Sequence, residues 1–220
     1  MKIKDSFKKF KKTSTLQKLN KIISRDIKDI KNINILEFGV DKGISTGFFL
    51  NFCKKNKGKL LSVDSIEYSH LYNEKNWTFI NCKDYEIKKV LKNKSKTFDL
   101  IFLDTEHTAE HVKKLFYMYY PFLKKDGIFL IDDISWLPYI KNNYRDNEWI
   151  ENNNRQTFNT ILEIYNSNKK SFDLSFHFLE SGMVKIIKRN NKKLYLPNKI
   201  ILRNFSVKNI LRKFKNKLSS

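Results

Sequence analysis

The stretch that decides the fold runs from residue 35 to residue 46 and reads ILEFGVDKGIST. It begins as a short apolar strand that contains one acid, and two glycines then follow four residues apart. Hydroxyl residues stand where a helix should begin. Glycine lets the backbone pass close to a ligand and adopt dihedral angles that are closed to other residues. The pattern predicts a strand–loop–helix unit that holds a ligand at Glu37, Gly39, Gly43, Ser45 and Thr46.

The residues of this loop restrict the chemistry of the ligand. The helix start offers unpaired N–H groups and the positive end of a helix dipole to a polar or anionic group. Glu37 argues against a loop that serves only phosphate, because its carboxylate would repel a pyrophosphate. The loop also lacks the third glycine of G-x-G-x-x-G, so a nicotinamide site has little support. S-adenosylmethionine (SAM), with its sulfonium, amino group and ribose, fits better.

Length and charge suggest one nearly neutral domain with basic ends. A chain of 220 residues, 40% of them hydrophobic, is long enough for one well-packed domain. The net charge of +21 is concentrated at the termini. Residues 1–31 carry 11 Lys or Arg against 3 acids, and residues 181–220 carry 12 Lys or Arg and no acid. We expect a basic helical segment at 1–32, a catalytic domain at 33–189 and a basic tail at 190–220.

Cysteine usage and hydropathy bear on the compartment. Cys53 and Cys82 are isolated, with no CxxC or Cys/His cluster, so a structural zinc site is not expected. Residues 1–12 are charged throughout and contain no apolar core, so no signal peptide is expected. No stretch approaches eighteen consecutive apolar residues. We therefore expect a cytoplasmic protein.

Apolar and amphipathic segments alternate along the chain. Segments typical of strands lie at 33–38, 60–63, 77–80, 98–103 and 128–131, and helical patterns lie at 14–31, 45–55, 86–92, 108–119 and 156–166. Two further strands, 172–179 and 183–188, read as a hairpin around a glycine turn. This order predicts a parallel sheet with helices on both faces, closed by the hairpin.

The polar stretch 135–155 has no clear periodicity, and we expect a loop or lid there. Its aromatic residues Trp136 and Tyr139 could line an acceptor pocket or pack against their own domain.

Acidic residues follow several of these strands and should meet at the carboxyl edge of the sheet, where open α/β sheets bind ligands. Asp64 follows the second strand, 21 residues beyond Gly43, where a carboxylate can accept both ribose hydroxyls. Asp84 follows the third strand, where it could face an adenine amino group or merely start a helix.

Residues 33–188 resemble the class I SAM-dependent methyltransferases. The resemblance rests on residues 37–43, on Asp64 and on the fourth strand, 98–104. More narrowly, LDTEH at 103–107, PFLKKDG at 121–127 and LIDD at 130–133 resemble the metal-dependent small-molecule O-methyltransferases, closest to the branch grouped with macrocin O-methyltransferases and cephalosporin hydroxylase-like proteins. The resemblance implies a Rossmann-like fold, with a mostly parallel seven-stranded sheet and a C-terminal antiparallel hairpin.

The resemblance also implies a metal centre. It places a divalent cation between Asp104, Asp132 and Asp133, with His107 as general base. Three carboxylates at one sheet edge repel one another unless a cation or proton compensates. Oxygen ligands favour magnesium, manganese or calcium over zinc, with magnesium first among them. The alternative is that both final aspartates cap the next segment and that His107 merely adjoins a helix start. His111, one turn later on the same helix, could reach the cleft, but we expect it to be a solvated helix residue.

The tail contains a basic amphipathic pattern. Apolar residues fall on one helical face and lysines and arginines largely elsewhere, over Val207, Lys208, Ile210, Leu211, Arg212, Lys213, Phe214, Lys215, Lys217 and Leu218. Such a helix can lie on an anionic membrane, here the inner face. It can equally pack on its own domain, and clustered lysines also attract nucleic acid.

The leading hypothesis is a SAM-dependent, divalent-metal-dependent O-methyltransferase that acts on a hydroxyl of a small molecule or sugar. One alternative is an RNA or protein methyltransferase that uses the basic termini, although the N/D-P-P-Y motif associated with amino-group methylation is absent. Another is a non-catalytic membrane- or glycan-associated module of the same fold. The sequence leaves the oligomeric state open, with a homo-oligomer allowed.

Overall fold

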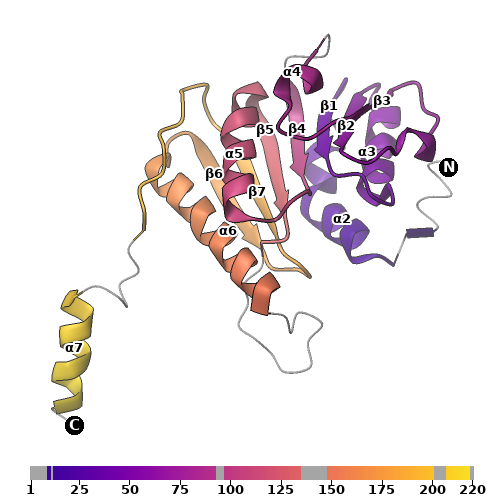
Figure 1. Cartoon of the computed structure of the whole chain (residues 1–220). Helices are drawn as coiled ribbons and strands as arrows, with labels where there is room; N and C mark the ends of the chain where they lie inside the picture. Colours follow the sequence, from indigo (N-terminus) through magenta and orange to yellow (C-terminus); the bar gives the residue numbers. More distant parts are fainter. Residues whose placement is uncertain (1–8, 11, 93–96, 135–147, 201–206, 219–220) are drawn as a thin grey trace.

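The structure is a computed structural model that describes residues 9–10, 12–92, 97–134, 148–200 and 207–218 (Figure 1). The strands are β1 (Asn34–Phe38), β2 (Lys59–Asp64), β3 (Trp77–Asn81), β4 (Phe98–Leu103), β5 (Leu123–Asp132), β6 (Phe172–His177) and β7 (Met183–Lys188). The helices are α2 (Ser14–Ile27), α3 (Ile44–Lys55), α4 (Ile87–Val90), α5 (Ala109–Tyr119), α6 (Glu148–Ser167) and α7 (Val207–Leu218).

Seven strands form one sheet in the order β3-β2-β1-β4-β5-β7-β6. Strands β1 to β5 pair in parallel, whereas β7 runs antiparallel to both β5 and β6. The predicted mostly parallel sheet with a C-terminal antiparallel hairpin is confirmed. The chain moves outward from β1 to β3 and then returns to β4, so the order reverses between β1 and β4. Ligands of open α/β sheets bind at the carboxyl ends of strands that flank such a reversal.

Helices cover both faces of the sheet, with α2 and α3 on one face and α4, α5 and α6 on the other (Figure 1). Successive strand residues point to opposite faces. Accordingly Ile35 packs in the cluster under α2 and α3, whereas its neighbour Leu36 packs in the cluster under the other helices. Because both faces are covered, these strands read as nearly continuous apolar runs.

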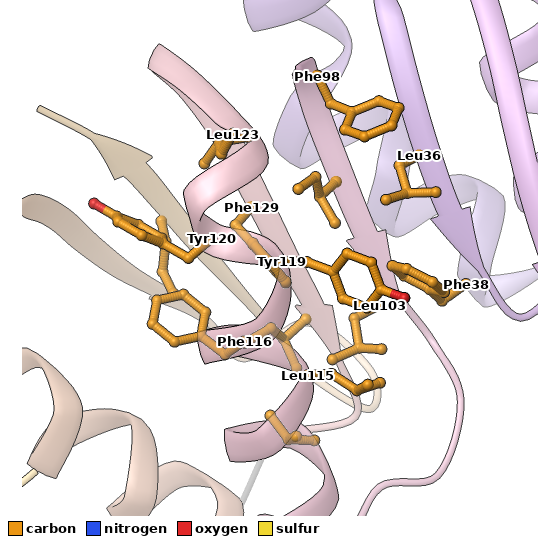
Figure 2. Packing of buried hydrophobic residues seen from close by; sticks show 14 of the residues in the cluster. Leu36, Phe38, Phe98, Leu103, Leu115, Phe116, Tyr119, Tyr120, Leu123 and Phe129 are labelled. Atoms are coloured by element: carbon orange, nitrogen blue, oxygen red, sulfur yellow. The ribbon is translucent and has the colours of Figure 1, made fainter. Parts of the chain in front are cut away.

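The core under α5 is built from interlocking aromatic rings (Figure 2). The ring of Phe116 lies 5.2 Å from that of Tyr120 and 5.2 Å from that of Phe129. Phe38 at the end of β1 lies 4.5 Å from Tyr119 in the same way. This packing fixes the end of β1, and with it the start of the glycine loop.

The N-terminal helix is part of the same packed body. Its apolar residues recur every three or four positions and lie buried against α3 and the sheet; they are Leu16, Leu19, Ile22, Ile23 and Ile27. Helix α2 ends at Ile27, four residues earlier than its sequence pattern predicts. The basic segment thus contributes a core-forming helix rather than only charge.

Helix α6 is longer than predicted. It begins at Glu148, so the predicted loop is wrong over 148–155. Asn154 and Thr157 are buried although they are polar, which hides the apolar periodicity at this end of the helix. Trp136 and Tyr139 lie outside the described residues. No helix in the described part of the chain is long and apolar enough to cross a lipid bilayer.

Candidate functional site

The glycine loop has the predicted strand–loop–helix form. Gly39 has φ of 90°, and a Cβ atom there would lie 1.8 Å from the backbone oxygen of Asp104. Only glycine therefore fits where the loop crosses the end of β4. Gly43, with φ of 73°, precedes the first turn of α3, and its carbonyl accepts a hydrogen bond of 2.7 Å from the Tyr72 hydroxyl. This bond holds the loop against the segment that follows β2.

Glu37 lies beneath the loop rather than in it. Because it lies two residues after Ile35, its side chain points to the same face of the sheet, toward α3, where Thr46 donates a 2.8 Å hydrogen bond to its Oε2 atom. Ser62 on β2 donates a second bond of 2.6 Å to the same oxygen. The side chain is fully buried, and its Oε1 atom has no hydrogen-bond partner among the described residues. Burial raises the pKa of Glu37 to about 7.

A cavity of about 610 Å³ opens at the carboxyl edge of the sheet, above the glycine loop. Its volume is in the range of small-molecule sites. Five carboxylates line it, from Asp41, Asp64, Asp84, Asp104 and Glu106, together with one lysine, Lys83. An excess of carboxylates suits a ligand with cationic groups and disfavours a pyrophosphate. Of the predicted cofactor residues, Gly39, Asp64 and Asp84 line the cavity. Glu37, Gly43, Ser45 and Thr46 are not among its lining residues, and Glu37, Ser45 and Thr46 are buried.

Asp64 caps two backbone segments and faces the cavity. Its Oδ2 atom accepts a 2.8 Å hydrogen bond from the Val40 N–H, and its Oδ1 atom accepts one of 2.9 Å from the Ile66 N–H. Each carboxylate oxygen has a second lone pair that can accept another donor. Asp64 can therefore have two roles at once: its carboxylate organises the loop by accepting backbone N–H groups, and it can also accept ligand hydroxyls.

Asp84 is held by two side chains of the segment after β4. Its Oδ2 atom accepts a 2.8 Å hydrogen bond from the Thr105 hydroxyl and lies 2.8 Å from Nε2 of His111. Helix α4 begins at Ile87, beyond Glu86, so the carboxylate of Asp84 is engaged across the cavity rather than at a helix start.

The prediction that His111 is a solvated helix residue is wrong. Its side chain is only 13% exposed and lines the cavity. Thr108 caps α5 by accepting a hydrogen bond from the His111 N–H, which places His111 in the first turn, next to the sheet edge. Long side chains in the first turn of a helix lean back toward its N-terminus. This capping threonine is a sequence signal that could have identified the residue.

The four residues of the predicted acidic centre do come together. Asp104 and Asp132 directly follow the paired residues Leu103 and Ile131 of β4 and β5, so they lie side by side at the strand ends. His107 Nε2 lies 3.4 Å from Oδ2 of Asp133 and 3.7 Å from Oδ1 of Asp104.

Two further features fix this centre in place. The backbone at Asp133 turns into the left-handed region, with φ of 54°. The Thr157 hydroxyl on α6 donates a 3.2 Å hydrogen bond to the His107 carbonyl, which ties the loop to that helix.

The crowding of carboxylates changes their proton affinity. Burial, followed by the charges of Asp132 and Asp133, raises the pKa of Asp104 well above its ordinary value. Because 29% of the Asp104 side chain remains exposed, solvent reduces the contribution of burial to this rise. The charges of Asp132 and Asp133 also raise the pKa of Asp104. Burial also raises the pKa of Asp132, and the adjacent Lys18 opposes the rise.

Lys18 on α2 is a member of this centre that the sequence analysis did not identify. Its ammonium donates hydrogen bonds to Oδ1 of Asp132 and to the hydroxyl of Ser181, and it lies 3.9 Å from Oδ1 of Asp133. The side chain is almost completely buried. Its position between Leu16 and Leu19 places a lysine on the apolar stripe of α2, and that misfit is the signal that could have revealed it.

The described residues include no group of three or more His, Cys, Asp or Glu side chains arranged to hold a metal ion. The metal site at Asp104, Asp132 and Asp133 therefore stays a prediction.

Comparison with known proteins bears on the fold and on the central part of the chain. Residues 36–134 match a family model described as a methyltransferase domain. A comparison with curated protein sequences gave no match.

Among solved structures, the methyltransferase MycE of the mycinamycin biosynthetic pathway, in complex with Mg, S-adenosylhomocysteine (SAH) and mycinamycin VI, has a TM-score of 0.60 at 16% identity. The alignment covers 89% of this chain and 57% of MycE, so the chain spans just over half of that protein's length.

Two other structures extend the likeness. A protein assigned as a caffeoyl-CoA O-methyltransferase from Staphylococcus aureus has a TM-score of 0.59 at 16% identity, and the alignment covers 86% of this chain and 92% of that one. The SAH-bound methyltransferase PaMTH1 of Podospora anserina has a TM-score of 0.53 at 18% identity, with 71% and 72% covered. Residues 36–134 thus match a methyltransferase-domain model, and the chain shares its fold with solved methyltransferases.

Proposed function

We propose that the chain is a SAM-dependent O-methyltransferase that acts on a hydroxyl of a small molecule or sugar. The observation that carries this proposal is that Asp104 belongs both to the acidic cavity and to the acidic centre at the carboxyl edge of the sheet. Asp104 lines the acidic cavity beside the glycine loop, and it also lies 3.7 Å from His107 in the acidic centre. A cofactor half and an acceptor half would meet at this residue.

The cavity supports the cofactor half. Asp64 accepts the ribose hydroxyls through lone pairs that Val40 and Ile66 leave open. Asp84, fixed by Thr105 and His111, accepts the adenine amino group. The surplus of carboxylates attracts the sulfonium and amino groups of SAM, which carry its positive charge.

The acidic centre supports the acceptor half. His107 takes the proton of the acceptor hydroxyl while Asp104 and Asp133 orient its imidazole. The hydroxyl oxygen attacks the SAM methyl carbon in line, the carbon–sulfur bond breaks, and the products are a methyl ether and SAH. A positioned base contributes about 10²–10⁴-fold to such a step. Much of the remaining acceleration comes from holding the oxygen close to the methyl group.

Divalent-metal dependence, with magnesium first, is the finer expectation that the resemblance adds. MycE binds Mg and SAH in its solved complex. In this chain Asp104 and Asp133 are oxygen donors of the kind that Mg²⁺ prefers. Asp132 is different, because Lys18 already contacts it. The donor set therefore does not fit a three-carboxylate metal site as it stands, and the proposed transfer depends on no step at a metal.

A radiolabel assay with the full chain tests the proposal. The protein is incubated with [methyl-³H]SAM and separate panels of phenols, sugars and RNA, and the products are identified by mass spectrometry. We expect label in a methyl ether of a hydroxyl acceptor and formation of SAH. The His107→Ala variant should lower kcat by roughly 10²–10⁴-fold and leave SAH affinity unchanged. His177→Ala, on the outermost strand β6, is the matched control. Label that enters only RNA would contradict the proposal.

A further inference from the structure

The buried ammonium of Lys18 needs a functional explanation. A lysine is almost never fully buried unless it is paired, because removing its charge from water is costly. Here the side chain is 2% exposed. It belongs to the apolar stripe of α2, where Leu19 and Ile23 are completely buried. An apolar residue at this position would complete the stripe. The chain instead places a cation against a carboxylate at the carboxyl edge of the sheet.

The orientation of Asp132 follows from the strand that carries it. Residues of β5 alternate between the faces, and Leu130 packs under α2 and α3. Asp132 therefore points to the same face and meets Lys18. Its Oδ1 atom also accepts a 2.9 Å hydrogen bond from the Asp133 N–H. This oxygen is fully engaged by two donors of the protein itself.

The position of Lys18 is where a cation shared by the acidic residues would be expected. Its ammonium contacts Asp132 and lies 3.9 Å from Asp133, and its positive charge also acts on Asp104. A divalent cation needs carboxylate oxygens at about 2.0–2.6 Å. It could not take Oδ1 of Asp132 without displacing the ammonium, which it would also repel.

Lys18 is also tied to the turn between β6 and β7. It donates to the hydroxyl of Ser181, and the neighbouring Gly182 carbonyl accepts a 3.1 Å hydrogen bond from the Asp133 N–H. The ammonium thus lies in a socket formed by the end of β5 and this turn. Displacing it would break contacts with both elements and leave a buried charge unpaired, which is strongly destabilising.

We infer that the ammonium of Lys18 takes the place of a divalent cation in the acidic centre, so that this centre binds no metal at Asp132. Its role in methyl transfer rests on the proposed function, but its effect on metal binding does not. Lys18 is a positioning residue that fixes Asp132 and Asp133 beside His107.

Binding of Mn²⁺ to the full chain, followed by electron paramagnetic resonance with SAH present, tests the inference. We expect the wild type to have no stoichiometric Mn²⁺ site that depends on Asp132, so that Asp132→Asn leaves its Mn²⁺ binding unchanged. Lys18→Met keeps most of the length of the side chain and removes its charge, and it should bind one Mn²⁺ at least about tenfold more tightly than the wild type. Lys18→Arg keeps the charge and should behave as the wild type. The double variant Lys18→Met/Asp132→Asn should lose the new site.

Two results would overturn the inference. One Mn²⁺ bound by the wild type and lost in Asp132→Asn would overturn the inference, even if Lys18→Met does not fold. A folded Lys18→Met that gains no Mn²⁺ would show that Lys18 only anchors α2, and would overturn it as well. Calorimetry of SAH on the same samples keeps the two proposals apart. A wild type that binds no SAH contradicts the proposed function and leaves the result on metal binding unchanged.

Discussion

The Nε2 atom of His111 on α5 lies 2.8 Å from the Oδ2 atom of Asp84, which follows β3. This contact spans the cavity, because α5 follows β4 whereas Asp84 follows β3, the outermost parallel strand. The Thr105 hydroxyl donates to the same oxygen. Two residues from one segment therefore fix the direction of a carboxylate on another, at the place proposed for the adenine amino group.

Replacing His111 by alanine should weaken cofactor binding. Asp84 would keep its bond from Thr105 but lose its second partner, so its carboxylate would be free to turn away from the ligand. We expect the Kd for SAH, measured by titration calorimetry, to rise about tenfold, or about 1.4 kcal/mol. His70→Ala, on the exposed turn after β2, should leave this Kd unchanged. Equal SAH affinities of His111→Ala and the wild type would show that Asp84 needs no support from α5.

The burial of Glu37 predicts how stability varies with pH. Its pKa is about 7 in the folded chain against 4.5 for the free group, so folding takes up a proton between these values. The free energy of unfolding should therefore fall as pH rises from about 4.5 to about 7, by about 3 kcal/mol in all, and level off above. Glu37→Gln cannot ionise and should lack this decline. Urea unfolding of both proteins at pH 5, 6, 7 and 8 measures the difference; curves that stay parallel would disprove the prediction.

The glycine loop predicts a steric effect at one position. A Cβ atom on Gly39 would lie 1.8 Å from the Asp104 carbonyl oxygen, and φ of 90° is a conformation that other residues rarely adopt. The Gly39→Ala chain must therefore shift the loop or β4. We expect a loss of stability of about 2 kcal/mol or more and no measurable SAH binding. Thermal unfolding and calorimetry check both. An alanine variant that binds SAH normally would refute the close approach of these segments.

The sequence predicts the parts of the site that depend on local pattern. Asp64, Asp104 and Asp132 each stand at the end of an apolar strand, and the carboxyl ends of parallel strands meet at one edge whatever covers the faces. Glu37 is a partial case. The strand and its acid are evident, but the two-residue period that turns the side chain toward α3 must be applied to see that it supports the loop.

What the sequence does not predict depends on contacts between distant elements. Lys18 shows itself as a lysine on an apolar stripe, but only the packing of α2 over the end of β5 supplies Asp132 as its partner. The role of His111 depends on the contact of the first turn of α5 with the segment that follows β3. The early start of α6 could not be predicted for a similar reason. Asn154 is polar and breaks the apolar pattern of the sequence, and only the tertiary packing of the helix buries it.

The C-terminal helix predicts a membrane interaction. Val207, Ile210 and Leu211 are exposed on α7, beside basic residues worth about 1 kcal/mol each near an anionic surface. We expect the chain to sediment with vesicles that contain phosphatidylserine, less so at high salt, and not with phosphatidylcholine alone. Changing these three residues to serine should abolish the binding. A serine variant that sediments as well as the wild type would mean that the apolar face makes no contribution.

Binding of SAH to the wild-type chain and to Asp64→Ala, measured by titration calorimetry, tests most directly whether the cavity is a cofactor site. We predict one SAH per wild-type chain and a Kd at least about tenfold higher for Asp64→Ala, because the ribose would lose a charged acceptor. Asp126→Ala, at an exposed position near the other end of β5, is the matched control and should bind as the wild type does. A folded wild-type chain that binds no SAH, or an Asp64→Ala variant with unchanged affinity, would contradict the assignment.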